Sequence, residues 1–175
     1  MKIIAGRLKG HVFAAPPGFR THPMGDRVRA GLFNVLGDVE ELQMLDAFAG
    51  SGALGFEALS RGARQILAIE VDRRAQDTIS KNVTKLGFTT DQYHLVHANA
   101  GSWSTNNPQA LFDVVFAAPP YDSLQIPLVK KLAQHVKPSG LFVLDWPGNQ
   151  PLPEIKGLQL VKDKSYGNAQ IAFYR

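Results

Sequence analysis

Cysteine is absent from this 175-residue chain, which excludes disulfide bonds, thiolate metal sites and a cysteine nucleophile. No apolar run approaches the roughly 18 residues that a membrane span requires, and no signal-peptide pattern follows Met1. The five histidines have no metal-ligand spacing, because His94 and His97 lie three apart in an expected strand and point to opposite faces. These absences favour a cytoplasmic protein that binds no metal.

Hydrophobic residues make up 45% of the chain, which is enough for one globular domain over residues 1–175. The net charge of +4 is unevenly distributed. Residues 1–29 contain six Lys or Arg against one acidic residue, so this segment carries +5 and the other 146 residues carry −1. Charge concentrated at one end favours a phosphate-bearing partner, and nucleic acid in particular.

The stretch from Met44 to Ala58 combines a short apolar run, a glycine turn and a good helix former. The glycines at 50, 52 and 55 match G-x-G-x-x-G, and Glu70 follows at the end of the next apolar run. A turn of this kind lets backbone N–H groups approach a ligand at the positive end of a helix, and the acid is placed to hold ribose hydroxyls. The pattern fits NAD and an adenosine-bearing cofactor equally well.

Alternating strand and helix patterns predict an α/β protein with a mostly parallel, doubly wound sheet. Strands are expected at 44–46, 65–70, 93–98, 112–117 and 140–145, and helices at 72–86 and 125–136. The segments 158–164 and 169–174 predict a C-terminal antiparallel hairpin. Residues 1–37 form a basic extension, with two short strands, a basic loop at 7–10 and a helix at 27–36 capped by Asp26; the core covers 42–175.

The fourth strand ends in Ala117-Ala-Pro-Pro-Tyr121. In an open α/β sheet, ligands bind beyond the carboxyl ends of the strands, so this segment is expected to face the Gly50 turn. Two prolines fix the backbone and leave carbonyl oxygens free to accept hydrogen bonds. Tyr121 offers a flat face on which a planar base can stack.

Together, Asp46-Ala-Phe-Ala-Gly-Ser-Gly52 and Ala118-Pro-Pro-Tyr121 resemble the class I S-adenosylmethionine-dependent amino-methyltransferases. The chain is most similar to the RsmD family, which methylates N2 of a guanine in small-subunit ribosomal RNA. Residues 3–10, 26–34, 48–61, 69–72, 99–100 and 166–167 carry that resemblance across nearly the whole chain. It implies a Rossmann-like methyltransferase fold and S-adenosyl-L-methionine as cofactor in place of NAD.

The resemblance also implies the site residues. Those expected to bind the cofactor are Asp46, Phe48, Ala49, Gly50, Ser51, Gly52, Ala53, Leu54, Glu70, Val71, Asn99 and Ala100. Those expected at the catalytic centre are Ala118, Pro119, Pro120 and Tyr121, which bind a flipped guanine. Candidate RNA contacts are Arg7, Lys9, Arg20, Arg27 and Arg29. The expected partner is 16S rRNA or an assembly intermediate of the small subunit, bound by a monomer.

One residue departs from the family pattern, which has Asp or Asn at the position of Ala118. The family uses that side chain, with the next backbone carbonyl, to accept hydrogen bonds from the target amine. The chain is therefore expected to be impaired, inactive or dependent on the Pro119 carbonyl, with Asp122 as a second acceptor to consider. Two other functions remain open: an adenine-N6 methyltransferase of DNA or RNA, and a non-catalytic RNA-binding or assembly factor that retains S-adenosylmethionine.

Overall fold

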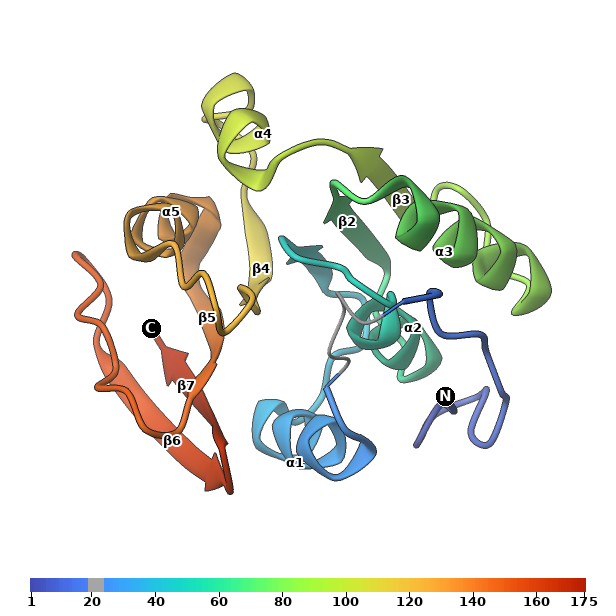
Figure 1. Cartoon of the computed structure of the whole chain (residues 1–175), viewed down its shortest axis with the longest axis horizontal. Coiled ribbons are helices and arrows are strands. Elements are labelled where there is room, and N and C mark those ends of the chain that lie inside the picture. Colours follow the sequence, from blue (N-terminus) through green and yellow to red (C-terminus); the bar gives the residue numbers. More distant parts are fainter. Residues whose placement is uncertain (19–23) are drawn as a thin grey trace.

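The computed structural model describes residues 1–18 and 24–175, which form a mixed seven-stranded sheet with helices on both faces (Figure 1). The helices are α1 (Asp26–Leu36), α2 (Ala53–Ser60), α3 (Arg73–Lys85), α4 (Ala100–Asn106) and α5 (Ile126–Leu132), with a 3-10 turn, η1, at Ala133–His135. The strands are β1 (Gln43–Asp46), β2 (Gln65–Glu70), β3 (Tyr93–His97), β4 (Phe112–Ala117), β5 (Val136–Pro147), β6 (Leu160–Tyr166) and β7 (Ala169–Tyr174).

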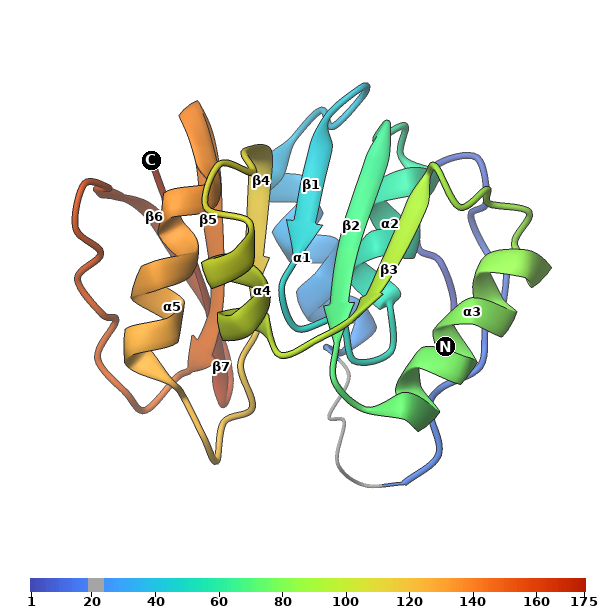
Figure 2. The ribbon, with the colours of Figure 1, turned by 90° about the horizontal axis from the view of Figure 1, so that it is seen from above.

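The strand order is β3-β2-β1-β4-β5-β7-β6, and β7 pairs antiparallel with both β5 and β6. This confirms the predicted doubly wound sheet with a C-terminal hairpin. It also confirms that β1 and β4 are neighbours, with Leu45 paired to Val115. The carboxyl ends of these two strands therefore meet at one edge of the sheet, which Figure 2 shows from above.

Two apolar clusters lie on opposite faces of the sheet. One joins residues of α1, α2 and α3 to the sheet, and the other joins residues of α4 and α5 to its second face. The nearly continuous apolar sequence of β4 is explained by this double coverage, because Phe116 packs into the first cluster and Val115 into the second. None of the helices in the described ranges combines the length and apolarity needed to cross a membrane.

The start of the chain forms a hairpin with one isolated antiparallel bridge, Lys2 to Val12, where two short strands were predicted. Gly10 N–H donates to the Ile3 carbonyl at 2.8 Å and fixes the turn. Phe13 is buried against Phe56 of α2, with ring centroids 5.1 Å apart in an edge-to-face arrangement. Burying a phenylalanine side chain contributes about 1.5–3 kcal/mol, so this contact helps to hold the hairpin on the core.

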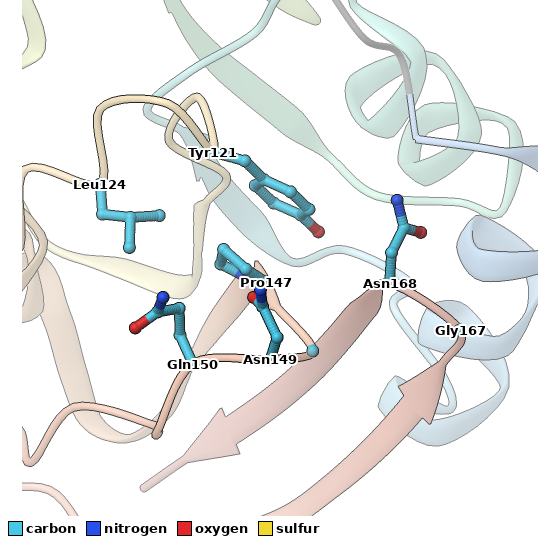
Figure 3. A pocket seen from close by; sticks show the side chains of 8 residues that line it. Tyr121, Leu124, Pro147, Asn149, Gln150, Gly167 and Asn168 are labelled. Atoms are coloured by element: carbon cyan, nitrogen blue, oxygen red, sulfur yellow. The ribbon is translucent and has the colours of Figure 1, made fainter.

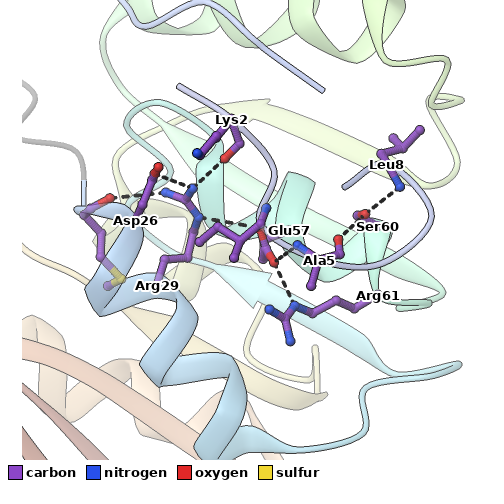
Figure 4. A network of polar contacts seen from close by, with 10 residues as sticks. Lys2, Ala5, Leu8, Asp26, Arg29, Glu57, Ser60 and Arg61 are labelled. Carbon is purple, nitrogen blue, oxygen red and sulfur yellow. Dashed lines mark hydrogen bonds and ion pairs between the residues drawn. The ribbon is translucent and has the colours of Figure 1, made fainter. Parts of the chain in front are cut away.

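A buried polar network fixes the same segment to α2 (Figure 4). The Glu57 carboxylate, which is fully buried, accepts the backbone N–H groups of Ile4 at 2.8 Å and Ala5 at 3.0 Å. It also accepts Arg61 Nε at 2.8 Å and lies 3.7 Å from Nε of buried Arg29. We call these side chains and backbone groups the Glu57 network. They attach residues 1–13, the first part of the predicted basic extension, to the core.

Helix α1 begins differently from the prediction. Its N-cap is Gly25, and Asp26 occupies the first helical position, where it pairs with Arg29 at 2.9 Å. The helix ends as predicted at Gly37, whose φ of 80° suits glycine. Midway along the helix, Gly31 makes room for the Tyr166 ring: a Cβ there would lie 1.9 Å from the Tyr166 hydroxyl oxygen. The β6–β7 hairpin therefore packs directly on α1.

Candidate functional site

The turn between β1 and α2 is built by two glycines in left-handed conformations. Gly50 has φ 53° and Gly52, the N-cap of α2, has φ 76°. A Cβ on Gly52 would lie 2.9 Å from the Tyr93 hydroxyl and 3.0 Å from the Phe56 ring. Glycine is needed here both for the backbone angle and for space. The remaining predicted residues of this segment, Phe48, Ala49, Ser51, Ala53 and Leu54, follow the same turn into the first helical turn.

Glu70 closes the turn from the end of β2. One carboxylate oxygen, Oε2, accepts Gly50 N–H at 2.7 Å, and the other, Oε1, accepts Val71 and Asp72 N–H at 2.8 Å each. The carboxylate thus joins the glycine turn to the start of α3. The predicted juxtaposition of loop and acid is present, and the acid is already held by three backbone donors in this structure. Val71 next to it is 63% exposed, so its side chain is open to a ligand.

Asp46 is buried at the end of β1, and neither carboxylate oxygen has a hydrogen-bond partner among the described residues. Burial raises the pKa of Asp46 to about 7, the Phe48 backbone amide opposes that rise, and the charge of Glu70 adds to it. The Tyr93 hydroxyl, within the same part of the chain, is likewise buried without a partner. Burial and the two nearby carboxylates raise its pKa. Unpartnered buried acceptors beside a glycine turn are expected where a ligand completes the hydrogen bonding.

Asn99 follows β3 and caps α4, a helix that the sequence did not predict. Its Oδ1 accepts the backbone N–H groups of Gly101 at 2.8 Å and Ser102 at 3.2 Å. The side-chain oxygen of this residue, which is expected to bind the cofactor, is therefore already engaged by two backbone donors. Ala100 is buried beneath this turn in the second apolar cluster.

The segment after β4 carries the second motif. Pro119 is buried, Ala118 is partly buried and Tyr121 is 40% exposed. The Tyr121 hydroxyl donates to Asp145 Oδ1 at 2.6 Å, and burial raises the pKa of Asp145 to about 6 while the Tyr121 hydrogen bond opposes that rise. Tyr121 also lines an open pocket of about 490 Å³. Figure 3 shows its ring between Leu124 and Asn168.

The basic residues separate into two groups. Arg29 is fully buried and donates to the Lys2 carbonyl at 2.7 Å and to Asp26 at 2.9 Å. Its prediction as an RNA contact is therefore wrong, because its charge is used inside the Glu57 network. Arg7, Lys9 and Arg27 are exposed, and the Arg7 guanidinium lies 5.1 Å from the centre of the Phe88 ring. Arg20 lies outside the described residues.

Two residues of this site were missed from the sequence, Asp145 and Tyr93. Asp145 could have been recognised, because it is an acid at the carboxyl end of an apolar strand, as Asp46 and Glu70 are. Tyr93 gave no comparable signal, since it opens its strand and reaches the glycine turn only through packing. Asp122, considered as a second acceptor, is exposed in the turn after the motif, and Asp145 is the carboxylate that contacts Tyr121.

Comparisons with known proteins agree with this architecture. The sequence model of the family described as "Conserved hypothetical protein 95" matches residues 1–175. "Ribosomal RNA small subunit methyltransferase D" of Haemophilus influenzae is 31% identical over 182 residues, covering 100% of this chain and 93% of that protein.

Solved structures also superpose over almost the whole chain. The Escherichia coli protein described as "Putative methyltransferase yhhF" gives a TM-score of 0.86 at 32% identity, covering 99% of this chain and 96% of that one. A hypothetical protein of Thermus thermophilus gives 0.85 at 28% identity, covering 99% of this chain and 98% of that one.

Proposed function

The chain belongs to the family of conserved hypothetical protein 95, the RsmD family, and from that premise we propose that it methylates ribosomal RNA. The proposed target is the exocyclic N2 amine of a guanine in small-subunit rRNA, and S-adenosylmethionine is the methyl donor. One observation carries the proposal: the glycine turn after β1 and the Pro-Pro-Tyr segment after β4 follow neighbouring strands at one edge of the sheet. Cofactor and target base would meet there.

The residues at the first half of this edge fit S-adenosylmethionine. Its ammonium group can satisfy the unpartnered Asp46 carboxylate, directly or through water, and the Gly50–Gly52 backbone leaves room for the methionine half. Glu70 would hold the ribose diol, Val71 would pack on the adenine ring, and the Asn99–Ala100 turn would meet the adenine edge. When bound, this cofactor supplies an electrophilic methyl group attached to a sulfonium sulfur. After transfer of the methyl group, that sulfur is left as a neutral thioether.

The residues at the second half orient the amine. An exocyclic amine conjugated to a purine is a weak nucleophile, so its lone pair must be turned toward the methyl group. The Pro119 carbonyl accepts one amine hydrogen, and the exposed face of Tyr121 stacks on the base. The Ala118 side chain has no hydrogen-bond acceptor, so we expect this chain to methylate more slowly than a chain with Asp or Asn at this position.

Calorimetry should show S-adenosylmethionine or its demethylated product binding to this chain, and Glu70→Ala should weaken binding by at least about tenfold. The substitution removes three hydrogen bonds to backbone donors in the two loops at the site, each worth on the order of 1 kcal/mol or more. Glu154→Ala, which removes an exposed carboxylate elsewhere, should leave affinity unchanged. Preferential binding of NAD would overturn the cofactor assignment.

RNA affinity should fall steeply with salt, because Arg7, Lys9 and Arg27 are exposed and are proposed to contact phosphates. Each phosphate contact contributes about 0.7–0.9 to the log–log salt slope, so Arg7→Ala with Lys9→Ala should reduce the slope by about 1–2. The matched charge loss Lys156→Ala with Lys162→Ala, at exposed positions near the other end of the sequence, should leave the slope alone. Equal slopes for all three proteins would show that the first pair only solvates the surface.

Transfer of a labelled methyl group to small ribosomal subunits or their 16S rRNA tests the reaction, with digestion of the product to identify the modified nucleoside. N2-methylguanosine is expected. N6-methyladenosine would favour an adenine methyltransferase. If both the native chain and Ala118→Asp bind cofactor and RNA but transfer no methyl group, a non-catalytic assembly factor is favoured. Ala118 is the residue that suggests this alternative.

A further inference from the structure

The sheet places Asp145 of β5 next to the Ala118–Tyr121 segment that follows β4. Strands β4 and β5 are parallel, and Ala117 pairs with Leu144. One residue further along, Ala118 and Asp145 occupy corresponding positions at the carboxyl ends of the two strands. Phe116 and Val143, two residues earlier, both belong to the cluster on the α1 and α2 face, so the alternation of a strand assigns Asp145 to that same face.

The neighbouring elements give the carboxylate one hydrogen-bond donor and one apolar neighbour. Tyr121 donates to Asp145 Oδ1 at 2.6 Å from the segment after β4. On the other side, β7 pairs Ile171 with Asp145, and the Ile171 side chain is buried and apolar. The sequence has one acid between the motif and α5, Asp122, and its side chain is exposed in the turn.

The pocket beside Tyr121 opens at the end of the strand that carries Asp145. It is lined by Pro147 at the end of β5, by Gly148, Asn149 and Gln150 after it, and by Gly167 and Asn168 of the β6–β7 turn (Figure 3). Gln170 holds its wall by donating to the Pro147 carbonyl at 2.9 Å and the Gln150 carbonyl at 2.7 Å. Three carboxamide side chains and one aromatic ring suit a planar base with donors and acceptors at its edge.

We propose that Asp145 supplies the acceptor that Ala118 lacks: its carboxylate accepts a hydrogen bond from the target amine, with Tyr121 holding it in position. This inference rests on the proposed function and assigns a catalytic group for it. The amine then has two acceptors, the Pro119 carbonyl and Asp145, on residues from adjacent strands. The nitrogen forms one bond to the methyl carbon and gives up one proton, and the Asp145 carboxylate takes that proton and releases it to solvent.

Asp145 can take the amine proton only when its carboxyl is ionised, so the rate should rise with pH through the range where Asp145 loses its proton. Burial raises the pKa of Asp145 to about 6, and the hydrogen bonds from Tyr121 and the Trp146 backbone hold it from rising further. Tyr121 is the titratable group that faces it from the β4 side, Trp146 adjoins it on β5, and β7 presents apolar Ile171. Tyr121→Phe should therefore move the midpoint upward, and Asp145→Asn should abolish it.

The decisive experiment measures single-turnover methylation for four proteins: the native chain, Asp145→Asn, Ala118→Asp and the double variant. In Asp145→Asn the one remaining oxygen is occupied by the Tyr121 hydroxyl, and the NH2 group that replaces the other oxygen cannot accept a hydrogen bond. This substitution should therefore lower the rate at least about tenfold in the native chain, but less than about threefold in the Ala118→Asp background. Equal losses in both backgrounds, or no loss in the native chain, would overturn the assignment. Asp163→Asn, at an exposed position on β6, controls for the chemistry of the substitution.

A second readout needs neither cofactor nor RNA. Carboxyl NMR titration of the folded chain should give Asp145 a midpoint near 6 that rises in Tyr121→Phe. A carboxyl with an ordinary pKa, unaffected by that change, would show that Tyr121 does not hold it and would overturn the assignment. If all four proteins bind S-adenosylmethionine yet transfer nothing, the proposed function fails, and the inference fails with it. Activity that is raised by Ala118→Asp but indifferent to Asp145→Asn in both backgrounds refutes the inference alone.

Discussion

Replacing Ala118 with aspartate should raise the single-turnover rate of methyl transfer by at least about tenfold. The target amine has two hydrogens and one delocalised lone pair, and fixed acceptors on both hydrogens leave the lone pair directed at the methyl group. Loss of one such preorganised partner typically costs roughly 10²–10³ in rate, or about 3–4 kcal/mol of barrier. The smaller expected gain reflects the acceptor that Asp145 already provides.

The comparison that isolates the acceptor uses three substitutions at one position. Ala118→Asn should also raise the rate, because its carboxamide oxygen can accept, whereas Ala118→Leu adds bulk without an acceptor and should not. Affinity for S-adenosylmethionine, measured by calorimetry, should change less than severalfold in all three, since position 118 belongs to the half of the site proposed to bind the base. An unchanged rate in the Asp and Asn variants would mean that the site does not work by holding both amine hydrogens.

Glu57→Ala should lower the free energy of unfolding by about 3–5 kcal/mol, the usual loss when one partner of a buried ion pair is removed. Arg29 would keep its buried charge with Asp26 as its remaining carboxylate, and the Ile4 and Ala5 N–H groups would lose their acceptor. For a domain of this size, the midpoint of thermal unfolding should fall by roughly 6–20 °C. Urea titration followed by circular dichroism measures the loss.

The same titration shows whether the contacts of the Glu57 network are coupled or independent. Arg29→Met should also destabilise the chain, and the double variant should lose less than the two single losses together, because removing both charges leaves neither one of the pair without its partner. Glu154→Ala, at an exposed position, should change stability by about 0.5 kcal/mol or less. A Glu57→Ala loss as small as that would mean that the hairpin is held by Phe13 and its apolar neighbours alone.

Local patterns predicted most of the sheet, because burial on both faces leaves a strong apolar signal. Strands β2, β4 and β7 have the predicted bounds, and α3 starts at the predicted cap, where Asp72 accepts the Ala75 N–H at 3.0 Å. Helix α4 was missed because Gly, Ser, Thr and Asn dominate its seven residues, and these have low helix propensity. It is held by the Asn99 cap and the packing of Trp103.

The candidate site could be predicted only as far as its parts lie in short motifs. The glycine turn, Glu70 and the Pro-Pro-Tyr segment are each readable in a few residues, and the sheet brings the strands that carry them together as expected. The burial of Arg29 beside Glu57 could not be predicted this way, because the two residues are brought together only when α1 packs on α2. Neither could the Tyr121–Asp145 hydrogen bond, which joins residues 24 apart and depends on the register of β4 and β5.

The contact between Gly31 and Tyr166 has a consequence for the order of events during synthesis. The hairpin at residues 1–13 emerges before the acceptor that holds it, because Glu57 follows 53 residues after Ile4. Helix α1 completes its packing later still, because Tyr166, whose ring fills the space at Gly31, belongs to β6. Contacts so distant in sequence form late and slowly. The nascent chain therefore carries α1 without its β6 partner through most of translation.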